Sequence, residues 1–165
     1  MFKIGGIFMM LGLEIRKACK EDAELVQKIT LDAFGRYVRK SSITNAIAAQ
    51  TETLDDIIQD IENEAVFIAT MYGRPAGSIR ILNEGDGMTR VSRIGVASEF
   101  RKIGVGNELM KKADEIMQTR FIKSAYLYTA LSNSRLIHFY RRHGFYLDSV
   151  DGSQDYPRAK LTKKF

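Results

Sequence analysis

A glycine-bearing turn at residues 101–106 constrains the fold of this chain more than any other stretch, because it joins a β-type run to an amphipathic helix. The turn has the pattern Arg101-x-x-Gly104-x-Gly106, and apolar residues follow it at three- and four-residue spacing: Val105, Leu109, Ala113, Ile116 and Met117. Glycines allow a close approach of the backbone to a ligand, and the first N–H groups of a helix point outward at the positive end of its dipole. This arrangement suits a pyrophosphate, although a simple tight connection is the alternative.

The elements on either side of that helix predict a parallel strand pair. Residues 124–129 alternate small or apolar side chains with tyrosines, as a strand does, and residues 89–96 form the strand before the turn. A strand, a crossover helix and a second strand pair in parallel. The apolar positions of the first strand change parity, with Val91 on one side and Ile94 and Val96 on the other, which predicts a bulge of one extra residue.

The rest of the chain alternates strand and helix patterns. We expect a strand at 13–18, a helix from Ala23 to Gly35, a helix from Thr53 or Leu54 to Ile61, a hairpin at 65–82 with its turn at 72–75, a helix at 133–143 that ends at Gly144, and a closing hairpin at 146–162. Residues 36–51 connect the first two helices. The polar residues there border an acceptor site or form ordinary surface: Arg36, Tyr37, Arg39 and Lys40.

Length and composition predict one globular domain, which we place at residues 13–165. Residues 1–12 are then an N-terminal extension. They are apolar but interrupted by Lys3 and three glycines, and they are shorter than the roughly 20 residues that a helix needs to span a bilayer. We therefore expect no membrane anchor, with Met9 or Met10 as the start of the folded unit.

Charge and cysteine content narrow the function classes. The net charge of +5 comes from basic residues scattered among 20 acidic ones, so a solvated surface or a phosphate-bearing small ligand explains it, and no nucleic-acid partner is expected. The single cysteine, Cys19, rules out an intrachain disulfide and favours a cytoplasmic location. One cysteine and two histidines also make a metal site unexpected.

With its flanks, the turn resembles the acetyl-CoA binding signature of the GNAT superfamily of N-acetyltransferases, Gln/Arg-x-x-Gly-x-Gly/Ala. The match runs from Val96 to Gly106, and Ser98 stands where a proline is frequent. The resemblance implies acetyl-CoA as co-substrate, with its pyrophosphate on the amides of the turn. The residues assigned to coenzyme binding in this segment are Arg101, Lys102, Ile103, Gly104, Val105 and Gly106.

Residues 133–145 resemble a second signature of the same family, Asn-x-x-Ala-x-x-x-Tyr-x-x-x-Gly-Phe. Asn133, Tyr140, Gly144 and Phe145 match, and Leu136 replaces the usual small residue. Two motifs in the right order are more specific than either alone. The fold that the resemblance implies is α/β (α+β), a mixed and mostly antiparallel sheet with one central parallel pair and helices on both faces.

Acetyl transfer to an amine needs a neutral amine, stabilisation of the oxyanion and a proton for the leaving thiolate. The resemblance assigns the thioester and its oxyanion to the backbone at Ile94, Gly95 and Val96, the proton to Tyr140, and the pantetheine arm to Asn133. The alternatives are that Tyr140 is a packed core aromatic and that Asn133 is only a helix cap. Glu84, Asp86 and Glu99 are available carboxylates, but none is marked as the base.

The leading function is therefore N-acetyl transfer from acetyl-CoA to a primary amine by direct transfer. Its rival is a non-catalytic acyl-CoA-binding or sensor domain, which needs the turn but no acceptor pocket. The acceptor, a small molecule or a protein, is not specified by any motif, and a homodimer stays open.

Overall fold

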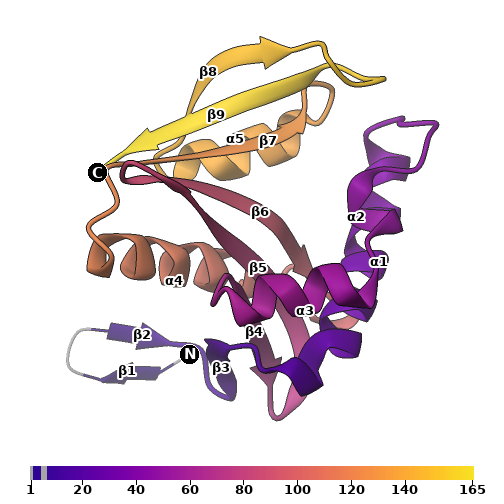
Figure 1. Ribbon diagram of the computed structural model, residues 1–165. Helices are drawn as coiled ribbons and strands as arrows, with labels where there is room; N and C mark the ends of the chain where they lie inside the picture. The colour runs from indigo at the N-terminus through magenta and orange to yellow at the C-terminus, as the bar shows by residue number, and fades with distance from the viewer. Residues whose placement is uncertain (1, 5–6) are drawn as a thin grey trace.

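The computed structural model describes residues 2–4 and 7–165, and a single seven-stranded sheet runs through its body (Figure 1). The strand order is β3-β4-β5-β6-β7-β9-β8, with β6 and β7 parallel and every other neighbouring pair antiparallel. The strands are β3 (Leu13–Lys17), β4 (Val66–Met71), β5 (Arg74–Gly85), β6 (Met88–Val96), β7 (Ser124–Ala130), β8 (Tyr146–Asp151) and β9 (Arg158–Lys164). This confirms the expected mixed sheet with one parallel pair.

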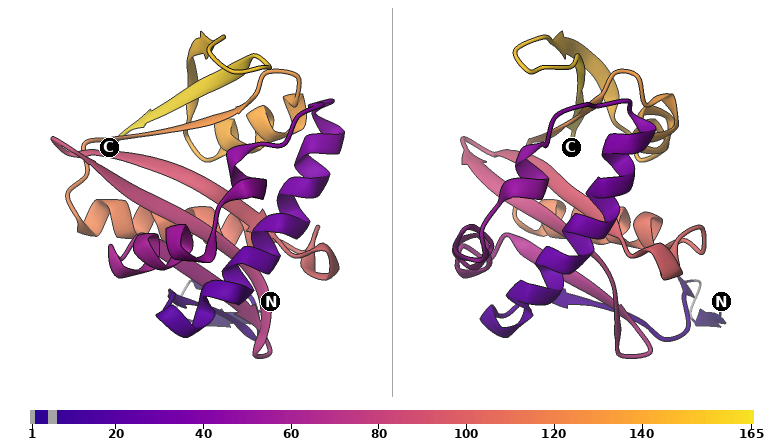
Figure 2. Two further views of the ribbon diagram at one scale, coloured as in Figure 1. Left: turned by 45° about the vertical axis from the view of Figure 1, so that its right-hand side comes forward. Right: turned by 90° about the vertical axis from the view of Figure 1, so that its right-hand side faces the viewer.

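Helices cover both faces of the sheet (Figure 2). One face carries α1 (Ala23–Lys40), α2 (Ala48–Thr51) and α3 (Leu54–Glu62), and the other carries α4 (Val105–Thr119) and α5 (Ser134–Arg142). The alternation of β4 explains the two layers: Val66 and Ile68 pack in the cluster of α1 and α3, whereas Phe67 and Ala69 pack in the cluster of α4. The expected helices on both faces are confirmed.

The parallel pair is short, and its shortness creates the site. Register pairing between β6 and β7 covers only Met88–Arg90 and Ser124–Tyr126. Beyond Arg90 the two strands diverge, so the carboxyl end of β6 and the end of β7 flank an opening in the middle of the sheet. Ligands in open α/β sheets bind at such a point, outside the carboxyl ends of the strands.

The predicted bulge lies at this opening. Ser78 pairs with Gly95, but Arg80 pairs with Ser92, so β6 has one residue more than β5 in the interval. Arg93 lies within the bulge and has φ 50°, in the left-handed region that long side chains rarely adopt. The parity change of the apolar positions in the sequence therefore reported a real irregularity of the strand.

Two local expectations were wrong. The first helix does not end at Gly35 but continues to Lys40, because Gly35 keeps a right-handed conformation and the ring of Tyr37 packs on Phe34 one turn earlier. The segment 36–51 also contains the short helix α2.

The first hairpin turn is tighter than expected. Tyr72 and Gly73, with φ 49° and 76°, form a two-residue loop, and β5 already begins at Arg74.

The N-terminal extension contains β1 (Phe2–Ile4) and β2 (Ile7–Met9), which form a separate two-stranded sheet. Met1, Gly5 and Gly6 of the extension lie outside the described residues. Within residues 2–4 and 7–165, no helix combines the length and the apolar character that crossing a bilayer requires.

Candidate functional site

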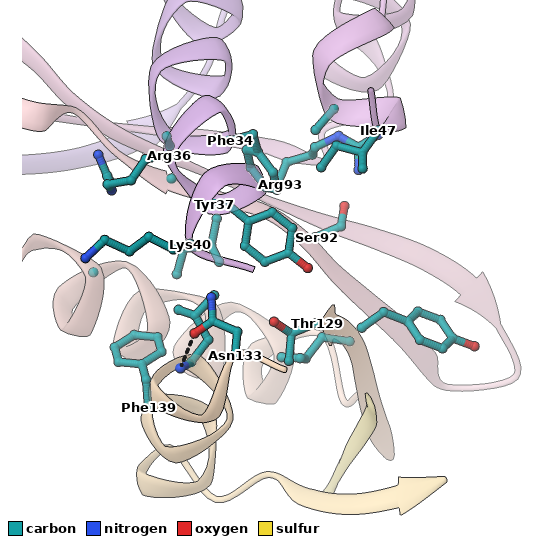
Figure 3. Close-up of a pocket in the computed structure, with 18 of the residues that line it drawn as sticks. Phe34, Arg36, Tyr37, Lys40, Ile47, Ser92, Arg93, Thr129, Asn133 and Phe139 are labelled. Atoms are coloured by element: carbon teal, nitrogen blue, oxygen red, sulfur yellow. Dashed lines mark hydrogen bonds between the residues drawn. The ribbon is translucent and has the colours of Figure 1, made fainter. Parts of the chain in front are cut away.

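A cavity of about 560 Å³ opens where β6 and β7 diverge, between the helices of the two faces (Figure 3). Its wall is formed by the end of α1, the segment leading into α2, the bulged half of β6, the turn before α4, the end of β7 and α5. The structure brings ten of the eleven sequence-predicted site residues to this cavity: Ile94, Gly95, Val96, Arg101, Lys102, Gly104, Val105, Gly106, Asn133 and Tyr140. Ile103 belongs to the turn but does not line the cavity, and its side chain is half exposed.

The turn before α4 has the conformation that an anion cradle requires. Gly104 is the N-cap of α4 with φ 104°, and Lys102 has φ 64°, so two residues of the turn are left-handed. No side-chain hydrogen bond caps the helix, which leaves its first N–H groups available to a ligand. A Cβ placed on Gly106 would meet Phe139 and Val96 at 3.7 Å, an ordinary contact, so the packing of the chain does not require a glycine at this position.

Ser98 anchors the segment that enters the turn. Its backbone N–H and its hydroxyl both donate to the carboxylate of Asp32 on α1, each at 2.7 Å. The hydrogen bond from the Ser98 hydroxyl is the main cause that lowers the pKa of Asp32. The serine that departs from the family's usual proline thus supplies an attachment to α1, a role that proline is unable to fill because it lacks an N–H.

Tyr140 lies on α5 with its ring in the core and its side chain lining the cavity. The ring packs edge-on against Phe139, at 5.3 Å between centroids, and against Phe145, at 6.4 Å. Burial, followed by the proximity of Tyr37, raises the pKa of Tyr140. Within residues 2–4 and 7–165 no hydrogen bond engages its hydroxyl, and the residue is one of those that line the cavity.

Asn133 is the N-cap of α5. Its Oδ1 accepts from the N–H of Leu136 at 3.2 Å, and its Nδ2 donates to Ser41 Oγ at 3.1 Å (Figure 3). The helix-cap alternative is therefore satisfied by these contacts. The second hydrogen of Nδ2 stays available, so the expected contact with the pantetheine arm stays a prediction.

Tyr37, which the sequence left open between the border of an acceptor site and ordinary surface, lines the cavity. Its hydroxyl accepts from the N–H of Ala130 at 2.8 Å, which joins the last turns of α1 to the end of β7 across the opening. Burial raises the pKa of Tyr37 to about 12. Tyr37 also lies one helical turn after Phe34, and the two rings pack edge-on on the same side of α1.

A buried ion cluster lies behind the cavity wall that α2 forms. The guanidinium of Arg80, which is 3% exposed, donates from both Nη atoms to Glu52 at 2.8 Å and from Nη1 to Asp60 at 2.9 Å. Arg93 Nε lies 3.4 Å from Glu52 Oε2. Glu52 directly follows α2, whose Ala48 and Ala49 line the cavity, so the cluster fixes that wall to the sheet. Nothing in the sequence patterns pointed to these pairings.

The carboxylates considered as bases are not at the cavity. Glu84 pairs with Arg90, Glu99 pairs with Arg74, and Asp86 sits in the β5–β6 turn with φ 52°. Asp155 is the one acidic residue among those lining the cavity, and it accepts from Asn45 at 2.9 Å. In the described part of the chain no group of three or more His, Cys, Asp or Glu residues is arranged to hold a metal ion.

Comparison with solved structures identifies several close relatives of the fold. The PaiA N-acetyltransferase of Thermoplasma acidophilum, solved in complex with coenzyme A, superposes with a TM-score of 0.81 at 20% identity over 94% of this chain and 100% of that one. The ribosomal-protein-alanine N-acetyltransferase of Brucella melitensis gives 0.72 at 20% identity over 92% and 99%. At these identities the likeness establishes the fold.

Sequence comparison adds two findings. Streptothricin acetyltransferase A of Bacillus subtilis is 29% identical over 102 residues, which are 62% of this chain and 59% of that protein, so the match spans about three fifths of the relative's length. A model of the acetyltransferase (GNAT) family matches residues 32–145, more than half of the chain and with both sequence motifs inside it. The chain belongs to the acetyltransferase (GNAT) family.

Proposed function

We propose that this protein is an acetyl-CoA-dependent N-acetyltransferase that moves the acetyl group directly from the thioester to a primary amine. The observation that carries the proposal is the opening between β6 and β7, which has the glycine turn at one end and the uncommitted hydroxyl of Tyr140 beside it. A pure coenzyme sensor needs the turn alone. The cavity extends beyond the turn to Ile47 and Arg93, and this additional space supports an acceptor pocket.

The residues of the turn would bind the donor. Gly104, Val105 and Gly106 line the cavity at the N-terminus of α4, which is the positive end of the helix dipole, and their backbone amides would suit the pyrophosphate. Arg101 and Arg36 would add positive charge there. Burial, followed by closeness to Arg101, lowers the pKa of Arg36, although Asp32 partly offsets this.

The bulged strand and Tyr140 would then supply the chemistry. As the amine nitrogen attacks the thioester carbonyl, negative charge develops on the carbonyl oxygen, and backbone N–H groups at Ile94 to Val96 would stabilise it. The C–S bond breaks, and the leaving thiolate takes the proton of the Tyr140 hydroxyl. The proton that the attacking nitrogen loses passes to water, and Tyr140 regains a proton from water. The raised pKa of Tyr140 keeps that proton in place until the thiolate develops.

The first experiment is to measure release of free coenzyme A thiol from acetyl-CoA across a library of amines. Turnover with any amine supports the transferase. Coenzyme binding with no turnover on any amine would favour the acyl-CoA sensor instead. Amino acids, peptides and amine-bearing antibiotics with free amines all belong in the library, because the relatives are named for both a small-molecule and a protein acceptor.

The second experiment is Tyr140→Phe, which removes the hydroxyl and keeps the ring packed on Phe145. We expect kcat to fall by about 10² to 10⁴ with coenzyme affinity nearly unchanged, because proton delivery contributes in the transition state. The loss should shrink with an acetyl donor whose thiol has a low pKa. Tyr146→Phe, on a half-exposed tyrosine of β8 outside the cavity, is the matched control and should keep the parent rate. A Tyr140→Phe enzyme at the parent rate would leave Tyr140 as a core aromatic.

We also propose that residues 13–165 act as one domain in the cytoplasm. The single, exposed Cys19 suits a reducing compartment. Mass determination of the purified chain at several concentrations tests the further possibility of a homodimer.

A further inference from the structure

The charged side chains that line the cavity are strongly unbalanced. Eight are basic and one, Asp155, is acidic; the basic ones are Arg36, Lys40, Arg90, Arg93, Arg101, Lys102, Arg135 and Arg158. The phosphates of a bound coenzyme account for a part of this excess. The question is which cations are left for the acceptor.

The basic residues divide between the two ends of the cavity. Arg101 and Lys102 belong to the turn, and Arg36 lies close enough to Arg101 for the two charges to disfavour each other. Figure 3 shows Arg36 and Lys40 extending to one side of the cavity, whereas Arg93 lies beside Ile47 and near Ser92, away from them. We call the end of the cavity at Ile47, Ser92 and Arg93 the acceptor end, and Arg93 is a cation of this end.

Two other arginines near this end are already paired. Arg90 Nε lies 3.0 Å from Glu84, and Arg158 pairs with Asp151 while its guanidinium stacks 4.3 Å above the ring of Tyr128. The carboxylate partners of both lie on or next to their own sheet strands. Neither arginine needs a further anion.

Arg93 differs because its partner is shared. Glu52 receives both Nη atoms of Arg80 at 2.8 Å, and Arg93 reaches it only through Nε at 3.4 Å. Within residues 2–4 and 7–165, the two terminal Nη groups of Arg93 make no hydrogen bond. The side chain is only 26% exposed, and burial, as the leading cause, lowers the pKa of this guanidinium despite Glu52. A partly buried cation with spare donors therefore faces the cavity.

The backbone at Arg93 is in the left-handed region, with φ 50°, and the bulge by itself does not require an arginine there. A non-glycine residue in the left-handed region is strained, and such outliers gather at binding sites. An asparagine or glycine would form the same bulge with less strain. Arg93 lines the cavity beside Ile47 and directly precedes Ile94, where the thioester carbonyl is expected (Figure 3).

We propose that the acceptor is an amine that also carries an anionic group, and that the terminal Nη groups of Arg93 bind this group. The proposal rests on the proposed acetyl transfer. The planar fork of a guanidinium matches two oxygens of a carboxylate or a phosphate. Amino acids, acidic peptide ends and phosphorylated amines meet this requirement, whereas polyamines and other polycations would face the excess positive charge of the cavity.

The test uses matched pairs of amines that differ only in the anionic group: an amino acid and its decarboxylated amine, and an aminoalkyl phosphate and its alcohol. For the unmodified enzyme we expect kcat/KM to favour the anionic member at least tenfold, mainly through KM. Comparing the carboxylate and phosphate pairs identifies which anion is preferred. An enzyme that prefers the uncharged or cationic member of every pair overturns the proposal without any variant.

Arg93→Met should reduce the preference to within about threefold and leave the KM for acetyl-CoA unchanged. Arg93→Asn is the second variant, because asparagine accepts the left-handed conformation and keeps the bulge if the methionine variant folds poorly. Arg74→Met, which removes an exposed arginine outside the cavity, is the control and should keep the preference. A preference that survives in a folded Arg93 variant assigns Arg93 to structure alone.

The outcomes separate the two proposals. If no amine is acetylated, the proposed transferase function fails. If amines are acetylated but the anionic member has no advantage, the transferase stands and the role of Arg93 falls.

Discussion

Arg80→Met tests whether the buried ion cluster behind the α2 wall of the cavity stabilises the fold. Arg80 is 3% exposed, and its two Nη atoms make three hydrogen bonds of 2.8–2.9 Å to Glu52 and Asp60. Removing one partner of a buried ion pair costs about 3–5 kcal/mol, because the remaining charge is left uncompensated. In the variant the stranded charge is Glu52, whose side chain is 8% exposed.

Three features place the expected loss at the low end of that range. Arg93 stays 3.4 Å from Glu52 and takes over part of the compensation, Asp60 is 26% exposed and reached by water, and Arg80 Nε is itself a buried donor without a partner. We therefore expect about 3 kcal/mol. For a chain of this size that corresponds to a fall in Tm of about 6–12 °C.

The assay is urea unfolding of Arg80→Met, Glu52→Leu and the double variant. If the loss comes from a stranded charge, the double variant is more stable than Arg80→Met, and the double-mutant cycle gives a coupling of about 1–3 kcal/mol. Arg74→Met, which breaks the exposed pair with Glu99, is the matched control and should cost less than about 1 kcal/mol. Strictly additive losses, or an Arg80→Met protein within 1 kcal/mol of the parent, would refute the reasoning.

Three further changes test the turn, the packing and the pH dependence. Gly106→Val should weaken coenzyme binding in a calorimetric titration by more than tenfold, about 1.4 kcal/mol. The variant should still fold, because a Cβ at this position meets only ordinary contacts. Gly104 variants are less informative, because a side chain there also suffers the strain of φ 104°. Gly95→Ala should lose about 1–3 kcal/mol in urea unfolding, since its Cβ would lie 2.8 Å from Ala33 Cβ, whereas Gly152→Ala, with open space, should stay within about 0.5 kcal/mol. The hydrogen bond from Arg16 is the main cause that lowers the pKa of Asp22 to about 2. The stabilisation that the Asp22 carboxylate contributes is therefore full above about pH 4 and is lost as the pH falls toward 2. The urea midpoints of Asp22→Asn should lack this part of the acid dependence, and identical pH profiles of the variant and the parent would contradict the prediction.

Much of the fold was predictable because its signals are local. The glycine turn, the apolar stripe of α4 and the crossover to β7 predicted the parallel pair, and the change of parity after Val91 predicted the bulge. Gly144 was correctly assigned as a stop because it follows the last turn of α5, where it adopts φ 86°. Such features depend on residues within one or two turns of each other.

The features that the sequence did not predict depend on contacts between distant segments of the chain. Gly35 stands where a stop is plausible, but the helix continues because Tyr37 reaches the backbone of Ala130, 93 residues away in the chain. The pairing of Glu52 with Arg80 joins a connecting segment to β5, and each residue alone resembles ordinary surface charge. The turn at residues 101–106 was visible in the sequence. Arg36, Tyr37 and Lys40 were left open between an acceptor site and ordinary surface, and all three line the cavity.

The extra residue of β6 links the packing of the sheet to the site. Because of it, Val91, Ile94 and Val96 all face the α4 side, while Ser92 and Gly95 face α1. If β6 paired regularly with β5 throughout, Ile94 would take the α1 face in place of Gly95, where a single Cβ already comes within 2.8 Å of Ala33. The close approach of α1 therefore requires the bulge. Since α1 also carries Tyr37 to the end of β7, the irregularity that turns Arg93 toward the cavity is the same one that lets α1 close over it.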